Sequence, residues 1–351
     1  MVPKMPNTDM AHPATYRAAI FRGPGKVDVV DLPYPECGDD EAIVRNMLTG
    51  ICGSDIFAWQ KHGPESRIWI DEEFGHESIS EVVALGKDVK GLSIGQRVFV
   101  NTDKAFRDRR RVSAAGGFSN YLRIPQCEVG YSLLPIDESI ALRAAVLFEP
   151  FVIGARGAKV LEPRSGDNAV VFGAGIIGMT SAIMLKWLGC DKVMIVDLSD
   201  FRLANARKLG FLTCNSAKED VLAVAKAAFG TARGYPAEKC GARLYIDAVG
   251  VGAVIESFAM LAPPNGALSL VGVHKAPVAM NLTEVAFNNW HIHGCGDTPT
   301  EDLWPEIVAM MRSGRFDLPA LVTHEFPIDN IADALIQACK PEEAQKVCIS
   351  F

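Results

Sequence analysis

Two kinds of hydrophobic pattern divide the chain near residue 156. Before this point, short apolar stretches separated by glycine turns predict strands at 27–30, 41–47, 79–85, 97–100 and 120–124. We expect these strands to form a mainly antiparallel, barrel-like domain. Beyond it, apolar strands alternate with amphipathic helical stretches, which is typical of a parallel, doubly wound sheet. The sequence therefore predicts an α/β protein with two domains.

The second part can be followed element by element. It predicts strands at 169–173, 193–197, 211–214, 243–247 and 267–272, and helices at 176–188, 200–209, 217–229 and 252–261. The alternation ends near Gly294. A helix from Leu303 to Ser313 and a region from Pro327 to Cys339 follow, and we expect them to return to the first domain. This gives one domain from 1–155 together with 295–351, and another from 156–294.

A glycine motif lies between the first predicted strand and helix of the second domain. It reads Gly173-Ala174-Gly175-Ile176-Ile177-Gly178, and strand, glycine turn and helix form the context in which such a motif binds a dinucleotide pyrophosphate. Asp197 ends the next strand, about 20 residues later, where the motif requires an acid. An aspartate there can accept hydrogen bonds from ribose hydroxyls and repels a 2′-phosphate, which favours NAD over NADP. A plain strand–helix unit with a strand-end aspartate is the alternative.

Composition and charge exclude several classes of protein. The chain has 351 residues and a net charge of −7, which argues against non-specific binding to nucleic acid or anionic membranes. No run reaches the ~18 apolar residues of a membrane span, and the segment 1–14 lacks the apolar core of a signal peptide. The nine cysteines are scattered and form no CxxC pair, so we expect reduced thiols and a cytoplasmic protein.

Three short motifs in the first domain carry metal-ligand chemistry. They are Gly50-Ile51-Cys52-Gly53-Ser54-Asp55, Gly75-His76-Glu77 and Phe148-Glu149-Pro150. Cysteine, histidine and carboxylate are the ligands of a catalytic zinc that keeps one position open for water or substrate. Each motif alone is more typical of ordinary packing or of a loop. Together with a dinucleotide motif in one chain, they predict a zinc site.

These motifs, with Gly116–Leu122, are similar in content, order and spacing to those of the zinc-dependent medium-chain dehydrogenase/reductase superfamily. The resemblance extends from about residue 16 to 351 and is nearest to the polyol, sorbitol and threonine dehydrogenase branches. It implies a GroES-like catalytic domain and a Rossmann domain that binds NAD. It also implies a small-molecule alcohol or ketone as substrate and a homodimer or homotetramer formed through the nucleotide domain.

The resemblance assigns roles position by position. Cys52 and His76 match zinc ligands, and Glu77 and Glu149 match two carboxylates, either of which can ligate the metal. Ser54 matches the hydroxyl that takes the substrate proton while hydride passes to the nicotinamide, and Asp55 matches a structural acid beneath the site. The expected cofactor contacts are Gly173, Gly175, Ile176, Ile177, Gly178, Asp197, Arg202, Val249, Val271 and Val273. His274 and Lys275 follow the last of these and are expected on the nicotinamide side.

The sequence also departs from the family pattern. No cysteine lies between Cys52 and Cys127, so we expect no structural zinc and one catalytic zinc per chain. Phe57 occupies the position where many members carry a relay histidine, so the proton path must use Ser54 with water or ribose hydroxyls. A basic stretch at 104–111 is interpreted as a solvated loop, with an interface or anion site as the alternative.

The substrate stays open at this point. Residues 294–298 lack the aromatic-Arg-Tyr run that helps sorbitol-type enzymes to hold a polyol, which argues against sorbitol itself. The leading hypothesis is an NAD-dependent dehydrogenase of a polyol-like or cyclic secondary alcohol. A threonine-like amino alcohol or a bulky hydrophobic alcohol is the alternative. A zinc-free quinone-reductase-like or NAD-sensing protein is a third hypothesis, and the intact ligand set Cys52, His76, Glu77 and Glu149 argues against it.

Overall fold

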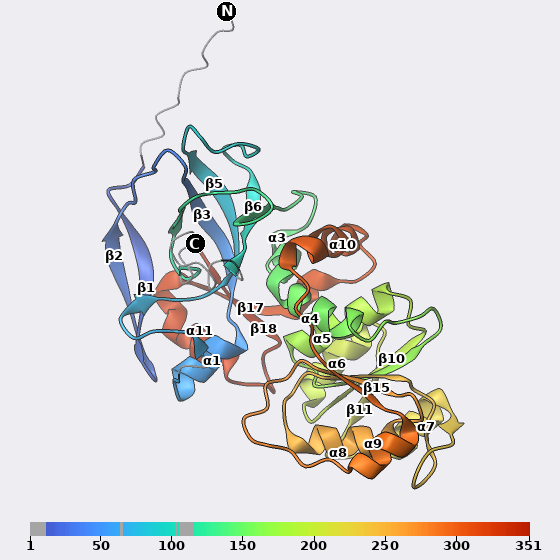
Figure 1. Cartoon of the computed structure of the whole chain (residues 1–351). Coiled ribbons are helices and arrows are strands. Elements are labelled where there is room, and N and C mark those ends of the chain that lie inside the picture. Colours follow the sequence, from blue (N-terminus) through green and yellow to red (C-terminus); the bar gives the residue numbers. More distant parts are fainter. Residues whose placement is uncertain (1–11, 64–65, 103, 105–115) are drawn as a thin grey trace, which may run out of the picture.

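The computed structural model describes residues 12–63, 66–102, 104 and 116–351. Its lower right part in Figure 1 is built on a six-stranded parallel sheet with the order β11-β10-β9-β14-β15-β16. The order changes direction between β9 and β14, and such switch points are where open α/β sheets bind ligands. The strands are β9 (Asn168–Phe172), β10 (Lys192–Asp197), β11 (Leu212–Asn215), β14 (Leu244–Asp247), β15 (Ala267–Leu270) and β16 (His291–Gly294).

Both faces of this sheet are buried. Ala169 and Val171 of β9 belong to one hydrophobic core, whereas Val170 and Phe172 belong to another. Successive side chains of a strand point to opposite faces, so helices must cover both sides, and this explains why these strands are continuously apolar. One face is covered by α4 (Phe148–Lys159), α5 (Ile176–Trp187) and α6 (Asp200–Lys208), and the other by α7 (Val221–Phe229), α8 (Gly252–Leu261) and α9 (Leu282–Asn288).

The upper left part of Figure 1 contains a second, mostly antiparallel sheet. Its central strand β3 (Ala42–Gly50) pairs antiparallel with β5 (Glu77–Leu85), β7 (Tyr121–Ile124) and β18 (Lys346–Ser350). The sheet continues through β6 (Arg97–Val100) to β8 (Leu133–Pro135), and β17 (Val322–Pro327) lies beyond β18. A three-stranded sheet beside it is formed by β2 (Lys26–Pro33), β1 (Thr15–Gly23) and β4 (Glu72–Glu73).

The end of the chain thus returns to the N-terminal part. Between β16 and β18 the chain forms α10 (Thr300–Arg312), which packs beside α4, and α11 (Ile331–Ala338), which packs beside α1 (Gly53–Gln60). The remaining elements are α3 (Leu142–Ala145), the short pair β12 (Thr231–Ala232) and β13 (Lys239–Cys240), and the 3-10 turns η2 (Leu318–Leu321) and η3 (Ile328–Asn330).

The predicted fold class is confirmed, and the differences are local. The helix predicted from residue 217 begins at Val221, because the Asp220 side chain accepts hydrogen bonds from the N–H groups of Leu222 and Ala223 and caps the helix there. The strand β16 and the helices α1 and α4 were not expected. No helix in the described ranges is long and apolar enough to cross a membrane.

Candidate active site

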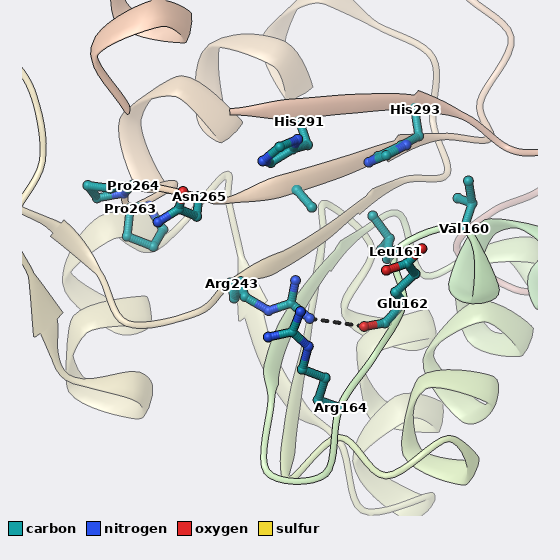
Figure 2. A pocket seen from close by; sticks show the side chains of 11 residues that line it. Val160, Leu161, Glu162, Arg164, Arg243, Pro263, Pro264, Asn265, His291 and His293 are labelled. Carbon is teal, nitrogen blue, oxygen red and sulfur yellow. Dashed lines mark hydrogen bonds between the residues drawn. The ribbon is translucent and has the colours of Figure 1, made fainter. Parts of the chain in front are cut away.

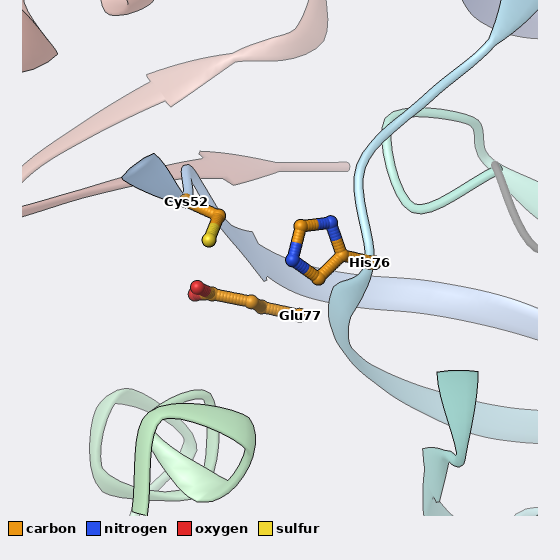
Figure 3. A group of neighbouring side chains, drawn as sticks. All are labelled: Cys52, His76 and Glu77. Carbon is orange, nitrogen blue, oxygen red and sulfur yellow. The ribbon is translucent and has the colours of Figure 1, made fainter. Parts of the chain in front are cut away.

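Three potential metal ligands meet where β3 ends and β5 begins. Cys52 is the N-cap residue of α1, just after β3, whereas Glu77 is the first residue of β5 and His76 precedes it. Gly50 pairs with Glu77 across the two strands, so the antiparallel register brings the cysteine to the His76-Glu77 pair. One ligand atom of each of the three residues lies within 4.8 Å of the others, and Figure 3 shows the side chains pointing into a common space.

This donor set fits zinc. A thiolate, an imidazole and a carboxylate are the ligands of catalytic zinc sites. Burial alone would lower the pKa of His76, but Cys52, Asp55 and Glu149 raise that pKa well above its usual range. Burial also raises the pKa of Asp55 to about 6. The negative charge gathered here is what a bound divalent cation would balance.

A buried lysine from the last strand enters the same cluster. Lys346 forms an ion pair with Glu77 and donates a hydrogen bond to the carbonyl oxygen of Ile51 at 2.8 Å. Burial acts to lower the pKa of Lys346, but the nearby Glu77 and Cys52 outweigh it and the pKa is raised. A Cβ atom on Gly50 would lie 2.3 Å from Glu77 Oε2 and 2.5 Å from Lys346 Cε. A side chain at this position would therefore displace the Glu77 carboxylate or the end of the Lys346 side chain.

Ser54 and Glu149 occupy the first turns of α1 and α4. The Ser54 hydroxyl oxygen is buried and has no hydrogen-bond partner among the described residues, although buried hydroxyls normally have one. This hydroxyl belongs to the residue two positions after Cys52, and no group of the described residues uses it as a donor or an acceptor. Glu149 is close enough to His76 to raise its pKa, but its carboxylate is not part of the group of ligand atoms within 4.8 Å.

The glycine motif has the geometry of a dinucleotide turn. Gly173 has a φ of 98°, which side chains with a Cβ rarely adopt. A Cβ atom on Gly178 would lie 1.8 Å from the Gly173 carbonyl oxygen, so this glycine lets α5 pack against the end of β9. Gly175 is the N-cap of α5, and a Cβ atom there would meet only Arg202 Nη1, at 3.8 Å. The backbone at Gly175, and the first N–H groups of α5 at Ile176 and Ile177, are thus open to an anion.

Asp197 turns from the end of β10 towards this motif. Its Oδ2 atom accepts a hydrogen bond from the Ala174 N–H at 2.6 Å, and its Oδ1 atom accepts one from the Ser199 N–H at 2.8 Å. Arg202 lies nearby on α6, and burial lowers its pKa although Asp197 opposes this. The predicted ribose-binding acid and the predicted pyrophosphate turn are therefore adjacent.

Two consecutive residues connect the glycine motif with the ligand cluster. The buried Gln345 donates a hydrogen bond to the Ala174 carbonyl oxygen at 2.8 Å. The next residue, Lys346, contacts Glu77. The segment that begins β18 thus contacts both halves of the candidate site.

The loops after β14 and β15 interlock at the same edge of the parallel sheet. Asp247 is fully buried, and its Oδ1 atom accepts hydrogen bonds from the N–H groups of Val249 and Gly250, both at 2.8 Å. His274 Nε2 lies 2.7 Å from Asp247 Oδ2. A Cβ atom on Gly272 would lie 2.3 Å from the Gly250 nitrogen, so the two loops are in direct backbone contact.

The apolar residues predicted to face the cofactor lie on these loops. Val249 and Val273 are exposed and Val271 is partly buried. Just beyond them, Lys275 Nζ lies 3.9 Å from the centroid of the Phe57 ring. This contact joins the loop after β15 to α1, the helix that begins at the ligand cluster.

A separate cavity of about 740 Å³ lies at the opposite ends of the strands. Figure 2 shows Arg164, Arg243, His291 and His293 among the side chains that line it. Arg243 is already paired with Asp167. None of the predicted ligands or cofactor contacts lines this cavity, so the candidate active site is elsewhere.

Three residues of the site were not predicted from the sequence. Lys346 could have been suspected, because a lysine in an otherwise apolar terminal strand requires a partner if the strand is buried. Asp247 is a strand-end acid in the parallel sheet, as Asp197 is, but no motif distinguishes it. Gln345 carries no signal that we can identify.

Two family models match the chain, in the order of its two parts. The model described as an alcohol dehydrogenase GroES-like domain matches residues 38–134, which include Cys52, His76 and Glu77. The model described as a zinc-binding dehydrogenase matches residues 177–313, which include Asp197. The chain is also 27% identical to L-threonine 3-dehydrogenase of Paraburkholderia phytofirmans, over 94% of this chain and 97% of that protein.

The chain belongs to the zinc-dependent medium-chain dehydrogenase superfamily.

Solved structures agree with the fold of this dehydrogenase. The chain superposes on 2R,3R-butanediol dehydrogenase from Bacillus subtilis with a TM-score of 0.81 and 20% identity, covering 96% of this chain and 99% of the other. Galactitol-1-phosphate dehydrogenase from Escherichia coli gives a TM-score of 0.79 and 20% identity, covering 95% and 100%. These two structures support the fold. The two family models and the threonine dehydrogenase relative identify the chain as an oxidoreductase of the zinc-type alcohol dehydrogenase family.

The basic stretch at 104–111 falls almost entirely outside the described residues. Its first residue, Lys104, forms an ion pair with Glu301 at 2.6 Å and lies over the Tyr131 ring. Within residues 12–63, 66–102, 104 and 116–351, the group Cys52, His76 and Glu77 is the candidate metal cluster.

Proposed function

We propose that this dehydrogenase oxidises a secondary alcohol to a ketone with NAD, using one zinc ion per chain. The observation that carries the proposal is the buried, unpartnered Ser54 hydroxyl, two residues from the cysteine of a Cys-His-Glu cluster. Zinc supplies Lewis-acid polarisation of the alcohol when bound, and NAD supplies the hydride acceptor. Cys52, His76 and Glu77 would hold the metal, with Glu149 as the second carboxylate of the site.

The chain's own residues handle the proton. Ser54 accepts it from the substrate hydroxyl, and because Phe57 has no polar group, water or a ribose hydroxyl carries it onwards. The open backbone at Gly175 and the N-terminus of α5 would bind the pyrophosphate. Val249, Val271 and Val273 would contact the nicotinamide half, and Asp197 with Arg202 the adenosine ribose. These residues orient the two reactants relative to each other.

Replacement of Ser54 by alanine tests the proton step. We expect kcat to fall by roughly 10²- to 10⁴-fold, the range of general acid–base contributions, with zinc content unchanged. The matched control is Ser54→Thr, which keeps a hydroxyl and should retain most of the activity. Steady-state kinetics across pH provides the measurement, and a Ser54→Ala enzyme with wild-type kcat at every pH would refute the role.

The preference for NAD is expected to depend on the charge of Asp197. In Asp197→Asn the negative charge that repels a 2′-phosphate is lost, and one acceptor for the ribose hydroxyls is weakened. The ratio of kcat/KM for NAD to kcat/KM for NADP should therefore fall by at least about tenfold, equivalent to ~1.4 kcal/mol. The control is Asp191→Asn, an exposed aspartate just before the other end of β10. An unchanged ratio in Asp197→Asn would contradict the assignment.

A threonine-like amino alcohol is the second candidate substrate. The 27% identity to L-threonine 3-dehydrogenase over 94% of the chain favours it. A panel of secondary alcohols, polyols and L-threonine, followed by NADH absorbance with and without a chelator, distinguishes the two candidates.

We further propose that residues 1–155 with 295–351 form the metal-holding domain and 156–294 the nucleotide domain, and that the protein is a cytoplasmic homodimer or homotetramer. The pairing of β18 with β3 supports the first proposal.

Exposed apolar side chains near the edge strand β16 support an oligomer formed through the nucleotide domain: Leu282 is 74% exposed and Phe287 66%. The nine cysteines are all free thiols, as expected for a reducing compartment.

A further inference from the structure

An uncompensated positive charge stands where the two parts of the molecule meet. Lys275 is exposed, and its ammonium lies 3.9 Å from the centroid of the Phe57 ring. In the described part of the chain Lys275 forms no ion pair with a carboxylate. A cation over an aromatic face is attracted to it but keeps its full charge, so Lys275 can still bind an anion.

The position of Lys275 relative to the candidate active site follows from α1. Ser54 and Phe57 are three residues apart on this helix, so they lie on the same face, separated by roughly 4.5 Å along the axis. Lys275 therefore contacts α1 at a residue that is one helical turn after Ser54 and on the same face of the helix. A small alcohol with its hydroxyl at Ser54 would extend towards Lys275.

The loop that carries Lys275 is held by the interior of the nucleotide sheet. The preceding residue, His274, contacts the fully buried Asp247 at 2.7 Å. The carbonyl oxygen of Asp247 also accepts hydrogen bonds from the N–H groups of Val271 and Gly272, at 2.9 and 2.8 Å. The backbone beneath Lys275 is thus fixed, as a specificity residue requires.

The cofactor does not supply the missing anion. Its phosphates are expected at Gly173–Gly178, on the N-terminus of α5, whereas Lys275 lies on the loop after β15 against α1. Beyond these phosphates, the nicotinamide ring and its ribose carry no anionic group, and the oxidised ring is itself positive. The anion that would pair with Lys275 therefore belongs to the substrate.

We propose that Lys275 binds a carboxylate or phosphate group of the alcohol substrate, so that the enzyme prefers anionic secondary alcohols to neutral ones. This inference rests on the proposed function, because it assumes that the substrate hydroxyl lies at Ser54. Phe57 holds the ammonium in position, and Lys275 contributes to selectivity through ground-state binding.

The test compares matched substrates that differ in charge. One pair is 3-hydroxybutyrate and its methyl ester; the other is 2-hydroxypropyl phosphate and propane-1,2-diol. In the wild-type enzyme we expect kcat/KM to be at least tenfold higher for the anionic member of one pair than for its neutral member. Which of the two pairs shows this preference tells whether Lys275 binds a carboxylate or a phosphate. In Lys275→Gln the ratio should approach one, mainly through KM. Lys208→Gln, which removes an exposed ammonium from the end of α6, should leave the ratio unchanged.

A binding measurement separates this inference from the proposed function. Butyrate and propyl phosphate carry the anion without the reacting hydroxyl, and calorimetry should show that Lys275→Gln weakens the binding of the preferred one by at least tenfold. If no alcohol is turned over but this binding still depends on Lys275, the proposed function fails, and only the role of Lys275 in binding an anion is supported. If the wild-type enzyme uses neutral and anionic alcohols equally well, or if neither anion binds in a Lys275-dependent way, the inference is overturned.

Discussion

Replacement of Cys52 by alanine is expected to remove bound zinc and to lower kcat/KM by roughly a thousandfold, or about 4 kcal/mol. The Cys52 thiolate would be one of the three ligands that the cluster offers to a metal. It also supplies part of the negative charge that raises the pKa of His76. Without this thiolate, the metal would be held by His76 and by Glu77, whose carboxylate also pairs with Lys346. Metal analysis of the purified protein and steady-state kinetics provide the two measurements.

The control for this experiment is another cysteine of the same chain. Cys37 is a free thiol whose sulfur contacts the carbonyl oxygen of Glu41, outside the cluster, so Cys37→Ala should keep one zinc per chain and full activity. The expected wild-type content is one zinc ion per chain. A Cys52→Ala protein that retained stoichiometric zinc and wild-type kcat/KM would refute the metal assignment. A wild-type content of two ions per chain would refute only the single-zinc proposal.

The second large effect is expected at Lys346. Its replacement by methionine leaves Glu77 buried without a positive partner, and breaking a buried ion pair from one side typically costs about 3–5 kcal/mol of the free energy of unfolding. We expect this loss in metal-free protein and a clearly smaller one in zinc-loaded protein, because a bound divalent cation then compensates Glu77. Denaturant unfolding of both forms measures the difference. The double variant Lys346→Met/Glu77→Gln should recover part of the loss in the metal-free form.

Lys239 provides the matched control. It is also a buried lysine, 3.8 Å from Glu284 and hydrogen-bonded to the Ala259 carbonyl oxygen, but it lies on the nucleotide sheet side of the molecule. Lys239→Met should destabilise the protein equally with and without zinc. If zinc changed the effects of the two substitutions by the same amount, the coupling between Lys346 and the metal site would be disproved.

The fold was predictable where local sequence alone determines the structure. The strand before Gly173 is apolar on both faces, and Gly173 and Gly178 each meet a steric requirement, so the strand–turn–helix unit was placed correctly. The edge strand β16 was not, because its residues His291–Gly294 are largely solvent-exposed and lack apolar alternation. The start of α1 follows Cys52 within a glycine-containing motif, which is more typical of a loop than of a helix.

The candidate site was predictable only in part. Cys52, His76 and Glu77 stand in recognisable motifs, and the strand register brings them together. Lys346 is far from them in sequence, and its role depends on the return of the last strand to β3, which no local pattern encodes. The same holds for Lys275 and Phe57, which belong to different parts of the chain and meet only in the folded molecule.

Because β18 joins the N-terminal sheet, only one of the two parts of the molecule is formed by a continuous stretch of the chain. The six strands of the parallel sheet come from one uninterrupted stretch, 168–294. The part of the molecule that contains the candidate metal cluster, by contrast, takes from residues 346–351 both a strand that pairs with its central strand β3 and the counter-ion of Glu77. An N-terminal fragment that ended before the parallel sheet would therefore lack both, and any extension fused to Phe351 would begin directly beside the sheet that carries the candidate active site.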